Sequence, residues 1–432
     1  MSKHILNELP ELLKAGIISA DTSDSIENYY RQKERAQPDG RINVVFAIIG
    51  TLLVSLGIIL IVAHNWDELS RPVKLFFAFV PVLLGQVLCG FTLYKKQDNI
   101  TWKECSASFL FFAAGACLAL VSQMYHINES LPDIIFNWML ITFPLIYIMR
   151  SSIVSLLFIC GTTIYAMYSG YDYSSSETYH YWWMILLVLP HYFYLLKDKP
   201  QSNFTFFHHW FIPLSLTICL GTLAHSSDEL MFIAYMSMFG AFYLIGTSDF
   251  FYGKRIFGNG YIVLGSLGTM CLLLALSSRW LWMDLIRYDK LQDWSLLSPE
   301  AMACIITTIA AVVLLFNHLK NRGSKPVNLM GFIFLAFVVI FFIGKTNPLL
   351  ATTATNLLVL AAAIFTIDRG NRLNHLGILN YGLLIIMALV VCRFFDTNIS
   401  FVIRGLMFIG VGAGFFIANS RLIKKRKQHE KN

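Results

Sequence analysis

Long apolar blocks separated by short polar segments fill the chain from about residue 43 onward. Each block holds roughly 17–23 residues and few charges, the length that a helix needs to cross a bilayer core of about 30 Å. The pattern predicts an all-α fold, a polytopic transmembrane helix bundle of about 14 spans. The approximate limits of the spans are 43–63, 73–94, 106–125, 132–149, 152–169, 180–196, 206–224, 229–247, 258–277, 299–317, 327–344, 348–367, 375–392 and 398–419.

The polar segment before the first span predicts a small helical hairpin. Four leucines between residues 6 and 13 recur at helical spacing, Gly16 ends that run, and Asp21 can cap a second helix. The predicted organisation is therefore an N-terminal cytoplasmic hairpin over 1–41, a transmembrane domain over 42–420 and a basic cytoplasmic tail over 421–432.

Composition excludes most soluble classes of protein. Hydrophobic residues make up 56% of the chain and charged residues 14%, about half the charged share of a soluble domain. The net charge of +7 is then explained by contact with membrane lipids. We do not expect nucleic acid as a partner. The expected partners are membrane lipids and either further copies of the chain or another membrane protein.

The distribution of positive charge predicts the orientation. If the N-terminus is cytoplasmic and every span crosses, 25 of the 33 lysines and arginines face the cytoplasm and 7 face outward. Positive charge concentrates on the cytoplasmic side of membrane proteins, so both termini are expected there. The basic tail then lies near anionic lipid headgroups.

The outer loop 278–298 differs from the short loops elsewhere because it mixes aromatic and charged residues. Trp280, Trp282 and Trp294 alternate with acidic and basic side chains. This mixture is typical of an amphipathic helix in the membrane interface. Two roles remain open for it, an interfacial buttress and a lid over an outward-facing site.

Motifs for soluble-type catalysis are absent from the sequence. There is no GxxxxGK[ST], HExxH or GxSxG, and the eight cysteines form no CxxC pair. His208 and His209 are adjacent and would point about 100° apart on a helix, a poor arrangement for chelation. We expect no metal, no other cofactor and no catalytic residue, although the sequence leaves an enzymatic role open.

Polar residues gather instead at the predicted outer ends of several spans. Arg404 lies about 9 Å into the last span, where a charged group usually faces a partner or a water-filled cavity. The predicted substrate-binding residues are His64, Asn65, Trp66, Asp67, Lys74, Gln123, Tyr125, His126, Arg393, Asp396 and Arg404.

Some of these residues carry a resemblance to a known family. The run Gly57–Asp67 with its Asn65-Trp66-Asp67 element after the first span, the segment Gln123–His126 and the stretch Arg393–Gly405 resemble a family of predicted bacterial integral-membrane proteins classed as a domain of unknown function. The resemblance is best over the first 150 residues and returns in the last forty. It implies a bacterial inner (cytoplasmic) membrane location and supplies no activity.

Three functional classes fit these observations. The first is transport or flipping of a small or lipid-linked anionic substrate through an outward-facing polar site, because Arg404 is suited to carboxylate or phosphate. A membrane scaffold or assembly factor needs no site. A membrane-embedded glycosyltransferase would use an acidic pair such as Asp67-Glu68 in the first outer loop. We favour transport and keep the other two as alternatives.

Overall fold

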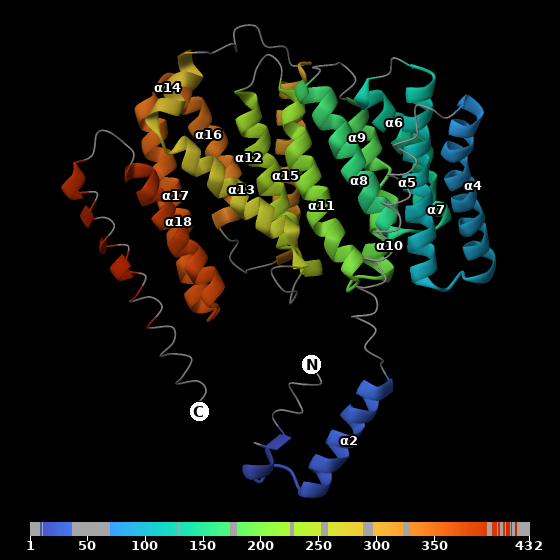
Figure 1. Ribbon diagram of the computed structural model, residues 1–432. Coiled ribbons are helices and arrows are strands. Elements are labelled where there is room, and N and C mark those ends of the chain that lie inside the picture. The colour runs from blue at the N-terminus through green and yellow to red at the C-terminus, as the bar shows by residue number, and fades with distance from the viewer. Residues whose placement is uncertain are drawn as a thin grey trace. The chain divides into compact units, whose positions relative to one another are not determined.

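The computed structural model describes residues 9–10, 12–36, 70–127, 130–172, 179–224, 229–251, 258–287, 297–322 and 329–394 of the 432-residue chain. It also describes 400–403, 405–406, 409–410, 412–414, 416 and 420 of the last predicted span. The chain forms two compact units, Met1–Phe77 and Ala78–Asn432, and each is described by itself. Every regular element among the described residues is a helix, so the fold is all-α (Figure 1).

In chain order the helices are α2 (Ala20–Ala36), α4 (Arg71–Lys95), α5 (Ile100–Met124), α6 (Leu131–Thr142), α7 (Pro144–Ile148), α8 (Ser152–Met167), η1 (Tyr168–Asp172), α9 (His180–Leu186), α10 (Leu189–Asp198), α11 (Asn203–Leu220) and η3 (Gly221–Leu223). They continue with α12 (Leu230–Gly246), η4 (Asp249–Phe251), α13 (Gly260–Leu276), α14 (Arg279–Arg287), α15 (Pro299–Arg322), η7 (Leu329–Phe332), α16 (Ile333–Thr346), α17 (Pro348–Arg372) and α18 (Leu376–Phe394).

Nine helical segments of the described chain are long and apolar enough to cross a membrane, and the number is ten if the bent pair α13–α14 counts as one span. The protein is thus a multi-pass integral membrane protein. The nine coincide with the predicted spans 73–94, 106–125, 132–149, 152–169, 206–224, 299–317, 327–344, 348–367 and 375–392.

The other five predicted spans look different. The span 180–196 consists of the two short helices α9 and α10, 229–247 is the 17-residue α12, and 258–277 is α13, which bends into α14. The span 43–63 lies outside the described residues, and 398–419 is described only in part. A total of fourteen spans therefore stays a prediction.

In the first unit a turn separates a short helical run from α2. Gly16 has a φ of +68°, and the N–H groups of Gly16 and Ile17 donate to the carbonyls of Leu13 and Leu12. This is the Schellman arrangement that ends a helix at a glycine. The prediction that Asp21 caps the second helix is wrong by two residues. The Ser19 hydroxyl accepts the capping bond from the Thr22 N–H, because serine before the first turn reaches the free N–H groups there.

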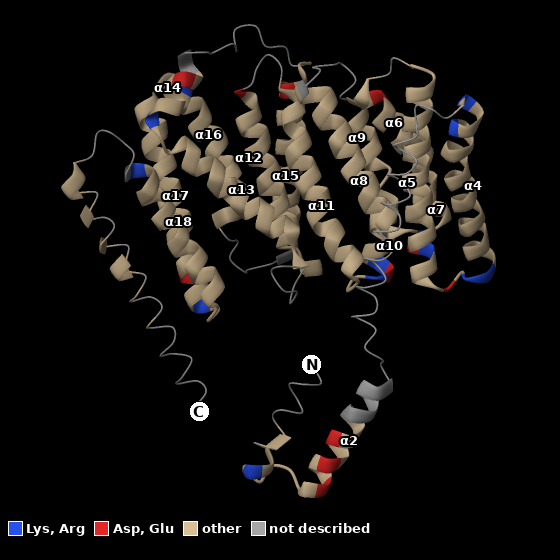
Figure 2. Ribbon diagram, in the orientation of Figure 1, with Lys and Arg blue, Asp and Glu red and all other residues tan. Residues whose placement is uncertain are grey.

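In the second unit the spanning helices stand side by side around two hydrophobic clusters. One is built mainly on α5, α6 and α8–α11 and the other on α13 and α15–α17, and α12 contributes buried residues to both. Charged residues lie mainly at the helix ends, as the blue and red segments of Figure 2 show. Arg369 and Arg372, for example, are in the last turn of α17. The middle of the unit is therefore apolar, and each buried polar group within it requires a physical explanation.

Candidate functional site

Gln123, Tyr125 and His126 lie together where α5 ends. All three side chains are exposed, and His126 has a left-handed φ of 48° that turns the chain out of the helix. The Tyr125 N–H still donates to the Val121 carbonyl, so the tyrosine is the C-cap of α5. These residues form an exposed helix end.

Arg393 holds a corner at the end of α18. Its Nη2 donates to the hydroxyls of Ser277 and Ser278, at 3.1 Å each, where α13 bends by 84° into α14. Asn356 of α17 donates to the Ser277 carbonyl at 2.9 Å. Two neighbouring helices thus secure the bend through hydrogen bonds.

The helix predicted for the loop 278–298 is present as α14 (Arg279–Arg287). Trp282 is 1% exposed and donates from its indole N–H to the Leu276 carbonyl at 2.7 Å, whereas Trp280 is 63% exposed. One tryptophan therefore anchors α14 to the bundle while the other faces away from it. The described half of the loop has the contacts of a buttress. Residues 288–296, with Trp294, lie outside the described chain.

The structure separates the described members of the predicted site. Figure 1 places α5 and α18 at opposite ends of the second unit, so the α5 residues and Arg393 do not share one site. Lys74 belongs to the first unit. The remaining members, His64, Asn65, Trp66, Asp67, Asp396 and Arg404, lie outside the residues whose side chains are described.

A different set of buried polar side chains follows the contact between α8 and α11, which we call the α8–α11 seam. The Ser155 hydroxyl bonds His208 Nε2 at 2.9 Å, and the Thr163 and Ser215 hydroxyls bond each other at 2.6 Å. Both helices advance in the same direction between these pairs, so they are parallel. The pairs lie about 12 Å apart along the helix axes, from a rise of 1.5 Å per residue.

The first pair belongs to a group at the Ser152 end of α8, which we call the histidine cluster: Ser152, Ser155, His191, Tyr192, His208, His209 and Tyr261. The Ser152 hydroxyl lies 3.3 Å from His191 Nε2, and the Tyr192 hydroxyl lies 2.8 Å from His209 Nδ1. The rings of His191 and His208 have centroids 6.0 Å apart. All three histidines are buried, so α8, α10, α11 and α13 together enclose them.

A buried carboxylate lies beside this cluster. Glu104 of α5 is 6% exposed and accepts the backbone N–H groups of Ser152 and Ile153, at 2.9 Å each, as well as the Ser151 hydroxyl. These N–H groups open α8, where no carbonyl of the same helix can accept them. A negative charge is also favourable at this end of the helix dipole. Glu104 thus joins α5 to α8 and closes the Ser152 end of the seam.

The second pair belongs to the tyrosine cluster, which comprises Thr163, Tyr171, Tyr181, Ser215 and Tyr235. The Tyr181 and Ser215 hydroxyls lie 2.7 Å apart. The hydroxyls of Tyr171 and Tyr235 meet over Gly221, where an added Cβ would lie 2.4 Å and 2.8 Å from them. A larger residue at 221 would therefore have to displace both hydroxyls.

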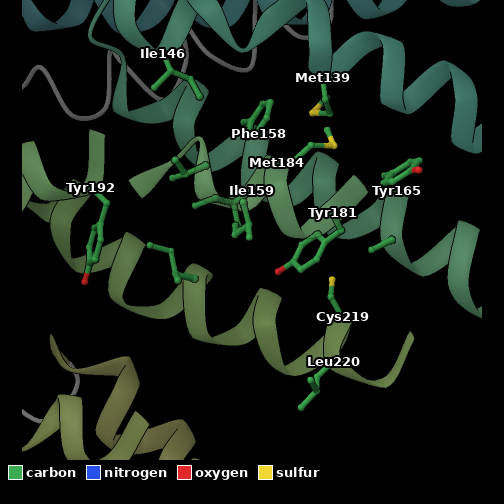
Figure 3. Close-up of a cluster of buried hydrophobic side chains, with 14 of the residues drawn as sticks. Met139, Ile146, Phe158, Ile159, Tyr165, Tyr181, Met184, Tyr192, Cys219 and Leu220 are labelled. Atoms are coloured by element: carbon green, nitrogen blue, oxygen red, sulfur yellow. The ribbon is translucent and has the colours of Figure 1, made fainter. Parts of the chain in front are cut away.

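An apolar layer separates the two clusters. Between them the buried residues of α8 and α11 are Phe158, Ile159, Gly161, Thr162, Ile212 and Pro213. The one hydroxyl in this layer, on Thr162, donates to the Ile159 carbonyl of its own helix. In the view of Figure 3, Ile159 lies between Tyr192 of the histidine cluster and Tyr181 of the tyrosine cluster. The seam is thus polar at two levels and apolar between them.

Helix irregularities surround the seam. Pro213 interrupts the hydrogen bonds of α11, and α8 passes into the π-helix η1, which carries Tyr171. The break between α9 and α10 falls at Leu187–Val188, before Pro190, and the Tyr147 hydroxyl donates to the Leu187 carbonyl there. Three of the helices that line the clusters are therefore discontinuous or distorted.

The chemistry available in the seam is hydrogen bonding and proton exchange. Among the described residues, no group of three or more histidine, cysteine, aspartate or glutamate side chains is placed to hold a metal ion. The seam offers imidazole and hydroxyl groups, each of which both donates and accepts. It could therefore bind polar groups or protons.

Sequence reasoning missed this site. The inference that adjacent His208 and His209 diverge agrees with the structure, since His208 bonds Ser155 and His209 bonds Tyr192. What the sequence did not reveal is that His191, seventeen residues before His208, meets the same group. The available signal was the presence of three histidines in otherwise apolar spans, together with hydroxyl residues on one face of 152–169.

Comparison with known proteins agrees with the resemblance seen in the sequence. Residues 10–155 match the family described as predicted membrane protein (DUF2157). No curated protein and no solved structure matches the chain. The matched segment includes Glu104 and the first residues of α8 but ends before the helices that carry the three histidines.

Proposed function

We propose that the protein transports a polar substrate across the membrane along the α8–α11 seam. The observation that carries this proposal is the two buried polar pairs, Ser155–His208 and Thr163–Ser215, which lie at two levels of one seam with an apolar layer between them. A transporter that exposes its site alternately to the two sides needs such an arrangement, because each level must be wetted in turn while the layer blocks a continuous water path.

The free-energy cost of buried polar groups supports this role. Polar side chains inside a membrane bundle are expensive and tend to mark pathways for substrates, ions or protons. A scaffold could fill these positions with apolar residues and pack equally well. The breaks in α9–α10 and α11 also fit transport, because discontinuous helices typically line transporter sites.

The orientation predicted from the charge distribution would assign each cluster to one side of the membrane. With fourteen spans, both termini cytoplasmic and a bacterial inner-membrane location, Arg150 precedes α8 on the cytoplasmic side, and the histidine cluster is the inner one. The tyrosine cluster then lies toward the outside. On the same outer side, Arg404 stays the residue predicted from the sequence to receive a small or lipid-linked anionic substrate. The exposed apolar side chains on the surface of the bundle would contact lipid, and some of them would contact a second copy of the chain in an oligomer.

Cysteine accessibility tests the proposal without knowledge of the substrate. In a background with all eight native cysteines replaced, Ser155→Cys and Ser215→Cys place one thiol in each cluster. Matched controls are Phe207→Cys and Leu214→Cys. Both residues lie on α11 at similar depths, but each is 45% exposed on the surface of the bundle rather than buried in the seam. Each variant is treated with a water-soluble, membrane-impermeant thiol reagent in right-side-out and inside-out vesicles.

We expect Ser155→Cys to react from the cytoplasmic side and Ser215→Cys from the outside, whereas both controls, facing lipid, stay unreactive. Labelling of the two buried positions shows that water reaches the clusters. If neither buried cysteine reacts in folded protein, although a cysteine at exposed Gln123 does, the seam is dry. The proposal is then wrong, and the scaffold alternative takes its place.

A further inference from the structure

The hydrogen bonds of His208 fix which of its ring nitrogens carries a proton. Nδ1 lies 2.7 Å from the Phe204 carbonyl, which can only accept, so this nitrogen must be the donor. Nε2 lies 2.9 Å from the Ser155 hydroxyl, which can donate or accept. A neutral ring therefore accepts the Ser155 proton at Nε2. A protonated ring donates to the same oxygen after the hydroxyl rotates, with no movement of heavy atoms.

His191 has a similar partner and lies next to His208. Its Nε2 is 3.3 Å from the Ser152 hydroxyl, and the two ring centroids are 6.0 Å apart. The exposed fractions are 4% for His191 and 0% for His208. Two imidazolium ions at this separation, shielded from water, would repel each other strongly, so the pair is suited to one positive charge and not two.

The charged and titratable groups around the pair come from every helix packed against it. Glu104 of α5 bonds the Ser152 N–H, one residue from the partner of His191. Lys199, the C-cap of α10, acts on His191 through its positive charge. Tyr192 and Tyr194 of α10, His209 of α11 and Tyr261 of α13 complete the surroundings. The one carboxylate of this set can balance one proton on the pair.

We propose that His191 and His208 form a proton-binding site that takes up one proton from water at the Ser152 end of α8 and holds it on an imidazole nitrogen. The N–H bond that forms replaces one O–H bond of a hydronium ion, which is left as water, and no other covalent bond changes. A role for this proton as the coupling ion of transport rests on the proposed function, whereas the binding of the proton to the histidine pair does not.

Nuclear magnetic resonance of protein labelled with ¹⁵N in its histidines tests the site directly. The full chain in lipid nanodiscs is titrated from about pH 8.5 downward, through the ordinary histidine range of about pH 5 to 8, until the protein unfolds. Signals are assigned with His191→Gln and His208→Gln, since glutamine keeps a donor and an acceptor in place. His375, which is exposed and caps α18 outside both clusters, provides an exposed histidine for comparison within the same molecule.

At high pH we expect His208 to carry its proton on Nδ1, with Nε2 unprotonated. Across the titration the pair should take up one proton in total, and in each single variant the remaining histidine should take up one by itself. Uptake of two protons at ordinary histidine pH, no uptake before the protein unfolds, or a His208 protonated on Nε2 alone at high pH would overturn the proposal.

The two proposals can fail separately. Cysteine labelling that finds the seam dry, together with uptake of one proton, rejects transport and keeps the proton site. A wet seam with two independently titrating histidines rejects the proton site and keeps transport.

Discussion

Two helix contacts of the same bundle are built in opposite ways. The α8–α11 seam is joined by side chains, through hydrogen bonds such as Ser155–His208 and Thr163–Ser215. The contact between α12 and α13, which we call the glycine seam, is joined by backbones. A Cβ added to Gly265 would lie 2.5 Å from the Tyr243 nitrogen, and one added to Gly246 would lie 2.5 Å from the Ile262 nitrogen.

The difference shows how one apolar composition can produce a movable and a fixed contact. Close backbone contact at small residues is a common basis of helix association in membranes, and it leaves no room for either helix to shift. Hydroxyl and imidazole groups, in contrast, can exchange one partner for another or for water. We therefore expect the α8–α11 seam to be the part that rearranges and the glycine seam to be the part that stays rigid.

The largest effect should come from filling the glycine seam. Gly265→Val places side-chain atoms against the backbone of α12, which cannot move aside, and should lower the free energy of unfolding by about 3 kcal/mol or more. Thermal unfolding in detergent measures the change. Gly90→Ala in α4, where nothing lies within 4 Å, is the control and should gain up to about 1 kcal/mol. Equal effects at the two glycines would remove the basis of the comparison.

Next in size is the loss of the carboxylate beside the histidine cluster. Glu104→Ala removes three hydrogen bonds from the start of α8, and the expected loss of stability is about 2–3 kcal/mol, since bonds to a charged group are worth more than neutral ones. Glu104→Gln keeps one accepting oxygen and should lose less. A glutamine variant as unstable as the alanine variant would mean that the negative charge, and not the hydrogen bonds, holds α5 to α8.

A smaller effect is expected at the α13–α14 corner. Arg393→Met keeps a long side chain but removes the bonds to Ser277 and Ser278, for a loss of about 1–2 kcal/mol. Hydrogen exchange of the α14 amides should rise in this variant while that of α8 is unchanged. If α14 keeps its protection, Trp282 alone secures the helix and Arg393 has another role.

The smallest effect should come from one hydroxyl of the tyrosine cluster. Tyr181→Phe leaves the Ser215 hydroxyl bonded to Thr163 and should cost about 1 kcal/mol. The fall in unfolding temperature measures this loss, and Tyr235→Phe provides a second member of the cluster for comparison. A cost comparable with that of Gly265→Val would show that the polar seam is as rigid as the glycine seam.

Much of the architecture could be predicted from the sequence. Apolar blocks of spanning length are set by local composition, so nine of the predicted spans coincide with helical segments that meet the length and hydropathy requirement. The helix of the outer loop and the glycine that ends the first helical run were predicted for the same reason. Where the prediction and the structure differ, at α9–α10, a break just before Pro190 divides the predicted span 180–196 into two short helices.

The site was not predictable in the same way. Sequence placed the polar residues of greatest interest at helix ends, where they are conspicuous against apolar spans. His191 and His208 are single polar residues within long spans. They have no periodic pattern, and their role depends on which residues of other helices face them.

Local hydropathy, turn chemistry and charge determined that the chain is a multi-pass helical membrane protein and predicted where most of its helices begin and end. The tertiary structure alone decided that α8 and α11 run parallel and that α10 and α13 pack against the histidines of α11. It also decided that α5 supplies Glu104 to the start of α8. The physical reason is that helix formation depends on neighbours within a few residues, whereas a buried hydrogen bond such as Ser155–His208 joins groups 53 residues apart and exists only once the helices have packed.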